Sequence, residues 1–466
     1  MSGLFQGLEI GKRALLGHQV QMQTIGHNIA NVDTPGYSRQ RVNISTSLPE
    51  RSIYGPLGSG MKVDDVTQIR DLFLGKQYRE AQKDFGRWTY IDKSLQQVEQ
   101  IFSEPEDGSL NDLLNDFWND WSSLATDPEN SGFRTTVLAD AGRLVDNFQN
   151  LAANLEELRL STDRDLQSMT NQINQMTTEV SRLNHDIKYQ ELDGSTANDL
   201  RDARDLIIDN LSNLIDVNTI DQPDGGATVM MGSMVLVDGS ESFDIGVTAT
   251  TEHGEVKHNI VWANSSYTLK NVSGQLAGLV ETRDEIIPGY ISKLNDLART
   301  VVEQVNALHS TGYTLDGHTG VNFFDPACTD AANIRINPEV LNNKNRIAAS
   351  DSSDPDELGN GHLAASLADL RDALIMSGNT VTMNDFYASL VGGLGVDAAQ
   401  ATSQTNNYEL ITQQVENQRQ SVQGVSLDEE LTEMVKAQHA YDAAARIITV
   451  MDDALDTVIH RMGITG

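Results

Sequence analysis

The stretch Asn28-Ile-Ala-Asn-Val-Asp-Thr-Pro-Gly-Tyr37 decides how the first part of this 466-residue chain folds. Before it, apolar side chains recur at alternating steps of three and four residues, which is typical of a helix with one narrow apolar stripe. Within it, Thr34-Pro35-Gly36 predicts a turn, because proline presets φ and glycine accepts a positive φ. We therefore expect the helix to end near Asn31 and a short strand to follow from Tyr37 to Ile44.

The two ends of the chain share this stripe pattern. Near the C-terminus, Ser426 and Glu429 form a capping-box pattern that predicts a helix start. A narrow stripe leaves most of a helix surface polar, so each terminal helix needs a partner, and we expect the two to pair as a coiled coil. The stripe positions are Met1, Leu4, Leu8, Gly11, Leu15, His18, Met22, Ile25 and Ile29 at one end, and Leu427, Leu431, Met434, Gln438, Tyr441, Ala445, Ile448, Asp452, Leu455, Ile459 and Met462 at the other.

The middle of the chain predicts a helical bundle interrupted by a small β region. Residues 133–193 lack proline and keep a helical apolar pattern up to Gly194, and residues 198–217 continue as another helix. Turn-forming Gly and Asp residues separate short β-rich runs over 217–270. Helical pattern resumes over 272–309 and again from His362 onward, with a loop region over 311–361 between them.

The sequence therefore predicts a mainly α fold with a β insert, elongated and divided into several domains. A chain of this length exceeds the size over which one hydrophobic core keeps growing. The domains that we expect are a terminal coiled-coil domain (1–62 plus 405–466), a discontinuous helical bundle (63–216 plus 271–404) and a small β domain (217–270).

Composition excludes several classes of function. The net charge of −34 argues against a nucleic-acid partner, because phosphate binding needs clustered Lys and Arg. No apolar run approaches the length of a membrane-spanning helix, so we expect no membrane insertion. The single cysteine, Cys328, cannot form a disulfide within the chain. Residues 1–30 do not resemble a secretory signal, so export would need another route.

Patterns that could carry chemistry are weak. The string from Val391 to Ala398 matches G-x-G-x-x-A, but a helical pattern rather than a strand precedes it, so we interpret its glycines as a flexible joint. His253 and His258 lack the spacing of a metal-binding pair. No nucleophile elbow occurs. We expect no catalytic residue, no cofactor and no metal ion.

The opening stretch, followed by Ser38-Arg39-Gln40, resembles the N-terminal signature of the flagellar rod, hook and hook-associated proteins, and within that family it is most similar to the hook-associated members. Further similar segments follow in the order of the family along most of the chain. They are Asn198-Asp199-Leu200 with Arg204-Asp205, Gly274–Gly278 through Arg283-Asp284, Asn306–His309, Gly312-Tyr313, Phe323-Phe324, Asn384–Leu390, Ser421–Glu430 and Gln438–Arg446.

The resemblance implies a structural role in the bacterial flagellum, as a junction between hook and filament. It implies self-association at the hook tip, contacts with the hook protein and with hook-associated protein 3, and a cytoplasmic export chaperone on the C-terminal helix. It also implies type III export to the cell exterior. The alternatives that stay open are another axial protein, such as a hook or distal rod protein, and a secreted adhesin or enzyme with its site in the β insert.

The residues that we expect to mediate assembly are stripe positions of the two terminal helices and the turn between the first helix and the strand, which the resemblance places at a subunit contact. They are Leu4, Leu8, Leu15, Met22, Ile25, Asn28, Ile29, Asn31, Thr34, Pro35, Gly36, Tyr37, Leu427, Leu431, Met434, Tyr441, Ala445, Ile448, Leu455 and Ile459.

Overall fold

The computed structural model describes residues 2–52, 55–102, 108–252, 255–262, 265, 267–269, 272–357 and 359–458. Helices account for most of these residues. They are α1 (Ser2–Ala30), α2 (Leu72–Phe102), α3 (Leu110–Thr126), α4 (Ser131–Gln190), α5 (Asn198–Leu214), α6 (Gly274–Glu281), α7 (Ile287–His309), α8 (Pro338–Asn342), α9 (His362–Ala368), α10 (Met383–Gln423) and α11 (Leu427–Asp456). Short helical turns are η1 (Glu191–Asp193), η2 (Thr282–Ile286, a π-helical turn), η3 (Lys344–Arg346), η4 (Pro355–Glu357) and η5 (Asp369–Arg371).

The strands form small antiparallel sheets. β1 pairs with β4, β2 with β3, β9 with β10 and β11 with β12, while β5 to β8 form one four-stranded sheet in sequence order. Their bounds are β1 (Gln40–Thr46), β2 (Glu50–Ser52), β3 (Gly55–Leu57), β4 (Met61–Gln68), β5 (Asn218–Asp221), β6 (Ala227–Met231), β7 (Met234–Asp238), β8 (Glu241–Ser242), β9 (Ile245–Glu252), β10 (Glu255–Trp262), β11 (Tyr313–Thr314) and β12 (Ala348–Ser350).

The predicted fold class, mainly α with a β insert, is confirmed. The chain divides into two compact units: the first contains Met1–Phe85, Thr170–Gly274 and Tyr408–Gly466, and the second contains Gly86–Met169 and Gln275–Asn407. Both units are built from segments that are distant in sequence. The division into three domains and the coiled-coil geometry of the terminal helices stay predictions.

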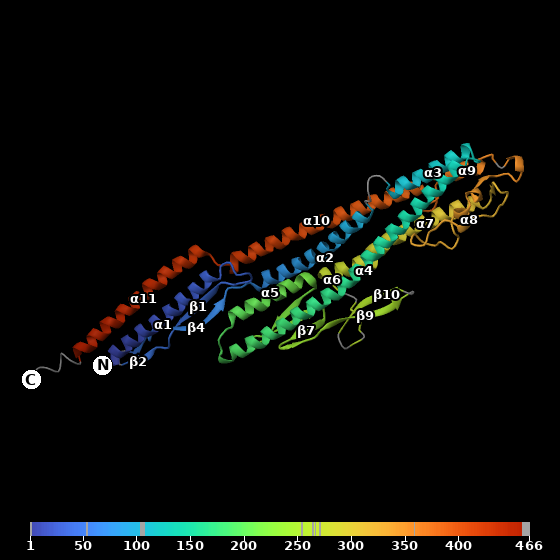
Figure 1. Ribbon diagram of the computed structural model, residues 1–466. Helices are drawn as coiled ribbons and strands as arrows, with labels where there is room; N and C mark the ends of the chain where they lie inside the picture. Colours follow the sequence, from blue (N-terminus) through green and yellow to red (C-terminus); the bar gives the residue numbers. More distant parts are fainter. Residues whose placement is uncertain are drawn as a thin grey trace, which may run out of the picture. The chain divides into compact units, whose positions relative to one another are not determined.

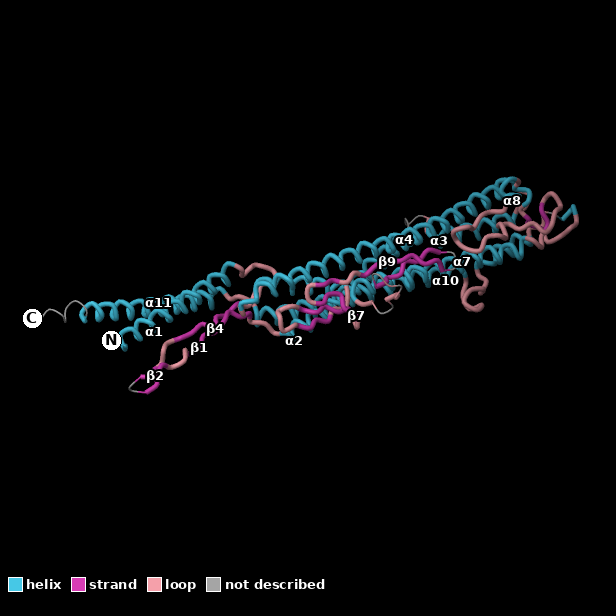
Figure 2. The backbone as a smooth tube through the Cα atoms, turned by 90° about the horizontal axis from the view of Figure 1, so that it is seen from below, coloured by secondary structure: helices cyan, strands magenta, loops and turns pink. Residues whose placement is uncertain are grey.

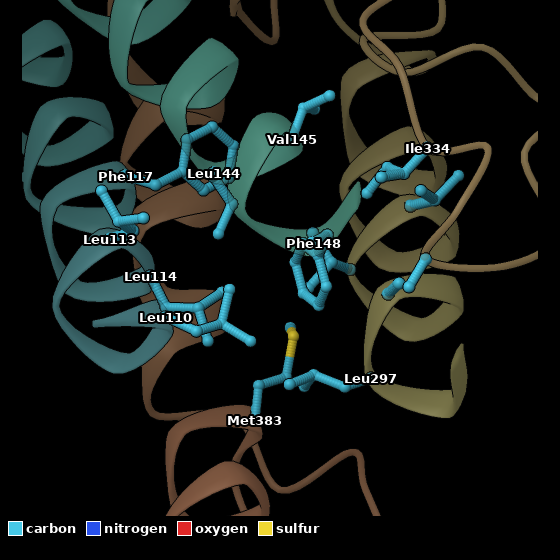
Figure 3. Packing of buried hydrophobic residues seen from close by; sticks show 14 of the residues in the cluster. Leu110, Leu113, Leu114, Phe117, Leu144, Val145, Phe148, Leu297, Ile334 and Met383 are labelled. Carbon is cyan, nitrogen blue, oxygen red and sulfur yellow. The ribbon is translucent and has the colours of Figure 1, made fainter. Parts of the chain in front are cut away.

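The second unit has a continuous apolar core between its helices. α3 presents apolar residues at steps of three and four, among them Leu114, Phe117 and Trp121, and all three are buried. Figure 3 shows Leu114 and Phe117 of α3 together with Leu144 and Phe148 of α4 in one cluster, to which Trp121 also belongs. Because the apolar stripe of each helix faces the others, burial of these side chains is the main stabilising term of this unit.

In the first unit, α1 and α11 lie side by side, and β1 and β4 contact α1 (Figures 1 and 2). The two helices come from opposite ends of the sequence, as the shared stripe pattern predicted. The β1–β4 pair is in register at Val42 and Val66 and shifts by one residue after Asn43. This unit therefore holds both terminal segments in direct contact.

The long middle helices were predicted closely. Residues 133–193 were expected to be helical, and α4 covers Ser131–Gln190. η1 then ends at Gly194, whose φ of 83° lies in the left-handed region that glycine adopts without strain. The predicted helix over 198–217 corresponds to α5, and the β insert contains β5 to β10.

The flexible joint expected at the glycines of Val391–Ala398 is wrong. α10 continues through this segment as one helix. Leu390, Leu394, Ala398 and Ala401 are all buried at steps of three and four, so a packed apolar face holds the helix across the glycines. Packing outweighs the cost of about 1 kcal/mol that each glycine adds to a helix interior.

Candidate assembly site

The turn after α1 forms as the sequence predicted. α1 ends at Ala30, the N–H of Thr34 donates to the carbonyl of Asn31 (3.0 Å), and the N–H of Tyr37 donates to the carbonyl of Thr34 (3.2 Å). Gly36 has a φ of 77°, and a Cβ at this position would lie 3.0 Å from the Cβ of Leu206 in α5. Glycine is therefore required here by both backbone conformation and space.

Asn28 is the centre of the site. Its Oδ1 accepts hydrogen bonds from the hydroxyl of Tyr37 (2.8 Å) and from the N–H of Gln40 (3.0 Å). Its Nδ2 donates to the carbonyl of Gln40 (2.9 Å) and to Oε2 of Glu430 (3.0 Å). Asn28 is 1% exposed, and all of its amide hydrogen-bonding capacity is used.

Glu430 links this turn to the C-terminal helix. It lies in the first turn of α11, is 2% exposed, and its Oε1 accepts from Nε of Arg39 at 2.6 Å. Nη1 of Arg39 donates to Glu429 (2.8 Å), and the N–H of Arg39 donates to the carbonyl of Gln423 at the end of α10 (2.8 Å). We call Asn28, Tyr37, Arg39, Gln40 and Glu430 the terminal clamp.

The predicted capping box at the start of α11 is wrong. Ser426 occupies the cap position but makes no side-chain hydrogen bond to the helix. Glu429, the other member of the pattern, pairs with Arg39 instead. Arg39 competes successfully for the carboxylate, because its guanidinium carries a full positive charge whereas the backbone N–H of Ser426 is neutral.

α5 also makes hydrogen bonds to the segment that contains Tyr37, Arg39 and Gln40 of the terminal clamp. The N–H of Ser38 donates to Oδ2 of Asp202 (2.9 Å), and Nε2 of Gln40 donates to Oδ1 of Asp199 (2.7 Å). Burial raises the pKa of the Tyr37 hydroxyl, and the nearby charges of Asp199, Asp202 and Glu430 raise it further. Tyr37 is therefore a neutral donor to Asn28 at any physiological pH.

A buried ion network joins α2, α5 and the end of α10. The carboxylate of Asp209 accepts from Nε of Arg79 (2.7 Å) and also pairs with Arg419. The guanidinium of Arg419 lies 4.2 Å from the centre of the Tyr78 ring. Because buried charges are stable only when they are paired, these contacts fix the end of α10, and hence the start of α11, on α5.

α1 and α11 approach closely where one of them has a small residue. A Cβ on Gly7 would lie 2.8 Å from Cε of Met451, and a Cβ on Gly11 would lie 2.8 Å from Cγ1 of Ile448. On α11, Ala444 is buried. Small side chains let the two helix backbones come together, so the contact depends on shape as well as on apolar area.

This contact corrects the predicted stripe on α11. The observed face runs through Glu430, Ala437, Ala444 and Met451, whereas Leu427 and Leu431 are exposed. The predicted positions Met434, Tyr441, Ala445, Ile448 and Leu455 are half-buried and flank this face. The physical reason is that close approach of the two helices places small residues at the contact, and three-four spacing alone does not distinguish these positions from their neighbours.

The other predicted positions divide as follows. Ile25, Asn28 and Tyr37 are buried; Leu8, Leu15, Met22, Ile29, Asn31 and Gly36 are half-buried; Thr34 and Pro35 are exposed. Leu4 lies in α1, but its side chain is not described. Ile459 lies outside the described residues, and so does His253 of the weak metal-binding pattern. Their predicted roles stay predictions.

Sequence reasoning missed the roles of Arg39, Gln40, Glu430 and Asp202. The sequence contains one signal for Glu430: Ala437, Ala444 and Met451 follow it at steps of seven residues. Met451 makes the close contact with Gly7. A polar residue at one position of an otherwise apolar heptad seam is typical of a residue that sets the register of the helix against its partner. No comparable local pattern marks Asp202, whose partner Ser38 is 164 residues away.

Family models match three parts of the chain. The helical domain of flagellar hook-associated protein FlgK matches residues 95–324, the C-terminal region of flagellar basal body rod FlgEFG proteins matches 416–461, and the flagella basal body rod protein model matches 8–37. Flagellar hook-associated protein 1 of Bacillus subtilis is 29% identical over 509 residues, covering 100% of both chains. The chain belongs to the flagellar hook-associated protein 1 family.

Two further relatives have the same name, flagellar hook-associated protein 1. The Salmonella typhimurium protein is 22% identical, and the alignment covers 95% of this chain and 97% of that protein. The Escherichia coli protein is 21% identical, and the alignment covers 99% of this chain and 100% of that protein. The solved structure of the flagellar hook junction protein FlgK from Burkholderia pseudomallei has a TM-score of 0.63 at 16% identity, covering 74% of this chain and 100% of its own, which supports the fold.

Membership of the hook-associated protein 1 family makes the chain a structural component of the bacterial flagellum that associates with other axial components. Among the described residues, no group of three or more His, Cys, Asp or Glu side chains is arranged to hold a metal ion. None of the described helices is long and apolar enough to cross a membrane.

Proposed function

We propose that this protein forms part of the junction between the flagellar hook and the filament, as a structural adaptor without catalytic activity. The observation that carries the proposal is the terminal clamp, because it ties two segments 402 residues apart into one unit. A subunit that must present both of its ends to neighbours in a tubular assembly needs such a link. The names of its relatives and of its structural neighbour point to the same place in the flagellum.

Copies of this chain associate with one another at the hook tip, with the hook protein below and hook-associated protein 3 above. α11 offers a surface for such contacts. Leu427, Leu431 and Val435 follow one another at steps of four on one face, and each is about half exposed (45%, 55% and 50%). A row of apolar side chains on a helix surface is typical of a protein-binding site. The predicted assembly residues belong to this proposal.

Before assembly, the protein leaves the cell through the flagellar type III pathway and then resides outside it. The exposed row on α11 would favour association in the cytoplasm, since burying apolar area is favourable wherever a partner is available. A cytoplasmic chaperone that covers the C-terminal helix prevents this. The same row thus serves the chaperone first and the neighbouring subunits later.

Electron microscopy of a strain that lacks this protein tests the proposal. We expect hooks that end without filaments, and expression of the wild-type chain in the same strain should restore the filaments. Normal filaments in the deletion strain would contradict the proposal. Normal filaments together with a loss of cell adhesion would instead support an adhesive role for the β insert.

A further inference from the structure

Two interacting aspartates, Asp120 and Asp140, lie where α3 and α4 of the second unit are joined by Arg143, far from the terminal clamp in sequence. Asp120 lies near the end of α3 and Asp140 lies in α4. Asp140 is 9% exposed, and Oδ2 of Asp120 is buried without a hydrogen-bond donor among the described residues. A buried carboxylate oxygen without a donor is costly, so this pair needs a physical explanation.

The charges around the pair do not balance it. Arg143, one turn further along α4, donates to Oδ1 of Asp140 from Nε (3.1 Å) and Nη2 (2.5 Å). The same Nη2 lies 3.8 Å from Asp116, one turn before Asp120 in α3. One cation therefore faces three carboxylates at this contact.

Two further described elements that pack against α3, η5 and α9, carry cations that are already paired. On η5, Arg371 pairs with its neighbour Asp372 and also contacts the side chain of Asn119. On α9, His362 pairs with Asp351. Among the described groups at this contact, Arg143 is shared between Asp116 and Asp140, so a proton on one carboxyl group relieves the remaining repulsion between Asp120 and Asp140.

The surroundings of Asp120 favour the protonated form of its carboxyl group. The pKa of Asp120 is raised to about 7, mainly by burial and further by a hydrogen bond with Asp140 and the charges of Asp140 and Asp116, while Arg143 opposes this rise. Two carboxyl groups can hydrogen bond with each other only when one of them is protonated. The protonated pair satisfies the buried oxygen that otherwise has no donor.

We propose that Asp120 and Asp140 share one proton in the folded protein and act as a proton-dependent latch between α3 and α4. Below neutral pH, one carboxyl group donates to the other and the two helices are joined. As the pH rises, the proton is lost, two negative charges face each other, and the contact weakens. The latch makes the second unit more stable in mildly acidic than in alkaline medium, and it goes beyond the role in the junction.

The pH dependence of the free energy of unfolding follows from proton binding to the folded and unfolded states. The folded state binds the proton more tightly than the unfolded state, so the contribution to stability is complete below the ordinary aspartate pKa and is lost as the pH rises toward neutrality and above. For a folded-state pKa near 7, the unfolding equilibrium constant should be about tenfold larger at pH 8 than at pH 6 from this pair alone.

Urea unfolding of the full chain at these two pH values tests the latch, with tryptophan fluorescence as the signal because Trp118 and Trp121 lie in α3. We expect the wild-type protein to show the tenfold difference and Asp120→Asn to lack it. Asp146→Asn is the matched control, because Asp146 is an exposed aspartate of α4 whose removal changes the net charge by the same amount. That control should keep the wild-type difference.

Infrared spectroscopy supplies a second measurement that works on the wild-type protein if Asp120→Asn fails to fold. A protonated carboxyl group has its own C=O stretching band, and we expect this band in the folded protein at pH 6 and its loss by pH 8. An absent band, or a pH dependence of unfolding that is the same in wild type and Asp120→Asn, would overturn the proposal.

Discussion

Nδ2 of Asn28, near the end of α1, donates a hydrogen bond of 3.0 Å to Oε2 of Glu430, near the start of α11, although the two residues are 402 positions apart. The Asn28–Tyr37 segment was expected to lie at a subunit contact. Within one subunit, its buried members Asn28 and Tyr37 hold the two ends of the chain together, and the subunit contact stays a prediction. Thr34 and Pro35 are exposed and remain available to a neighbour.

Removal of the Glu430 carboxylate should weaken the first unit. Glu430→Ala leaves the buried amide of Asn28 and the guanidinium of Arg39 without their acceptor, so we expect a loss of about 1–3 kcal/mol in the free energy of unfolding. Urea unfolding followed by circular dichroism measures it. Glu433→Ala is the control, because its ion pair with Lys436 is exposed and should contribute less than about 1 kcal/mol. Equal losses in the two variants would contradict the clamp.

The close approach of α1 and α11 predicts opposite effects at two glycines of α1. Gly11→Ala puts a methyl group 2.8 Å from Cγ1 of Ile448, so it should lower stability by about 1–3 kcal/mol. Gly26→Ala meets no atom within 4 Å and should raise stability by about 0.5–1 kcal/mol through better helix propensity. Thermal unfolding of both variants checks this. The packing model fails if Gly11→Ala is as stable as Gly26→Ala.

Two aspartate substitutions on α11 should separate folding from assembly. Leu431 is 55% exposed, so Leu431→Asp should change stability by less than about 0.5 kcal/mol and yet abolish filament growth. Ile448 contacts α1, so Ile448→Asp should abolish filament growth and also loosen the α1–α11 contact. Motility assays and hydrogen exchange over residues 2–30 distinguish the two effects. Normal motility with Leu431→Asp would count against the exposed row as a binding surface.

Much of the fold could be predicted because helix period is a local signal. α1, α4, α5 and α11 were all predicted from helical patterns, and the β insert was predicted from turn-forming residues between short β-rich runs. On α11 the spacing identified Ile448, which lies against Gly11, but it favoured the exposed Leu427 and Leu431 over the buried Ala437 and Ala444. The packed face depends on how closely the partner helix approaches, which is not a local property.

The polar part of the site was less predictable for a related reason. Arg79, Asp209 and Arg419 are charged residues that a composition-based reading assigns to the surface. Asp209 and Arg419 are buried and Arg79 is partly buried, because the carboxylate of Asp209 pairs with both arginines, which come from two other segments. Each segment taken separately shows an ordinary charged helix, so the pairing emerges only when the segments are brought together.

Acidification should destabilise the second unit through His309. Its Nδ1 donates to the carbonyl of Val321 (2.7 Å), and its Nε2 accepts from the N–H of Ala348 (2.8 Å), so the buried ring is neutral. Burial lowers the pKa of His309 to about 4. The unfolded chain therefore binds the proton more tightly, and stability is lost as the pH falls from about 6.5 toward 4, by about 3 kcal/mol at the lower end.

Urea unfolding across this range checks the effect of His309. His309→Gln should be less stable at neutral pH but should lack the acid-dependent loss, whereas substitution of the exposed His318 by Gln should keep it. Because the Asp120–Asp140 latch has the opposite pH dependence, the difference between wild type and His309→Gln is the quantity to compare. An unchanged acid slope in His309→Gln would rule out this group as its source.

The central claim is that the two ends of one chain pack against each other in the assembled flagellum. Disulfide cross-linking of Gly11→Cys with Ile448→Cys, in a chain carrying Cys328→Ser, tests it most directly in oxidised, isolated flagella. The control joins Ile448→Cys with Gly26→Cys, which is displaced by about 22 Å along α1. We predict a cross-link within single chains for the first pair and none for the control. Cross-links that occur only between different chains, or none above the control, would contradict the account.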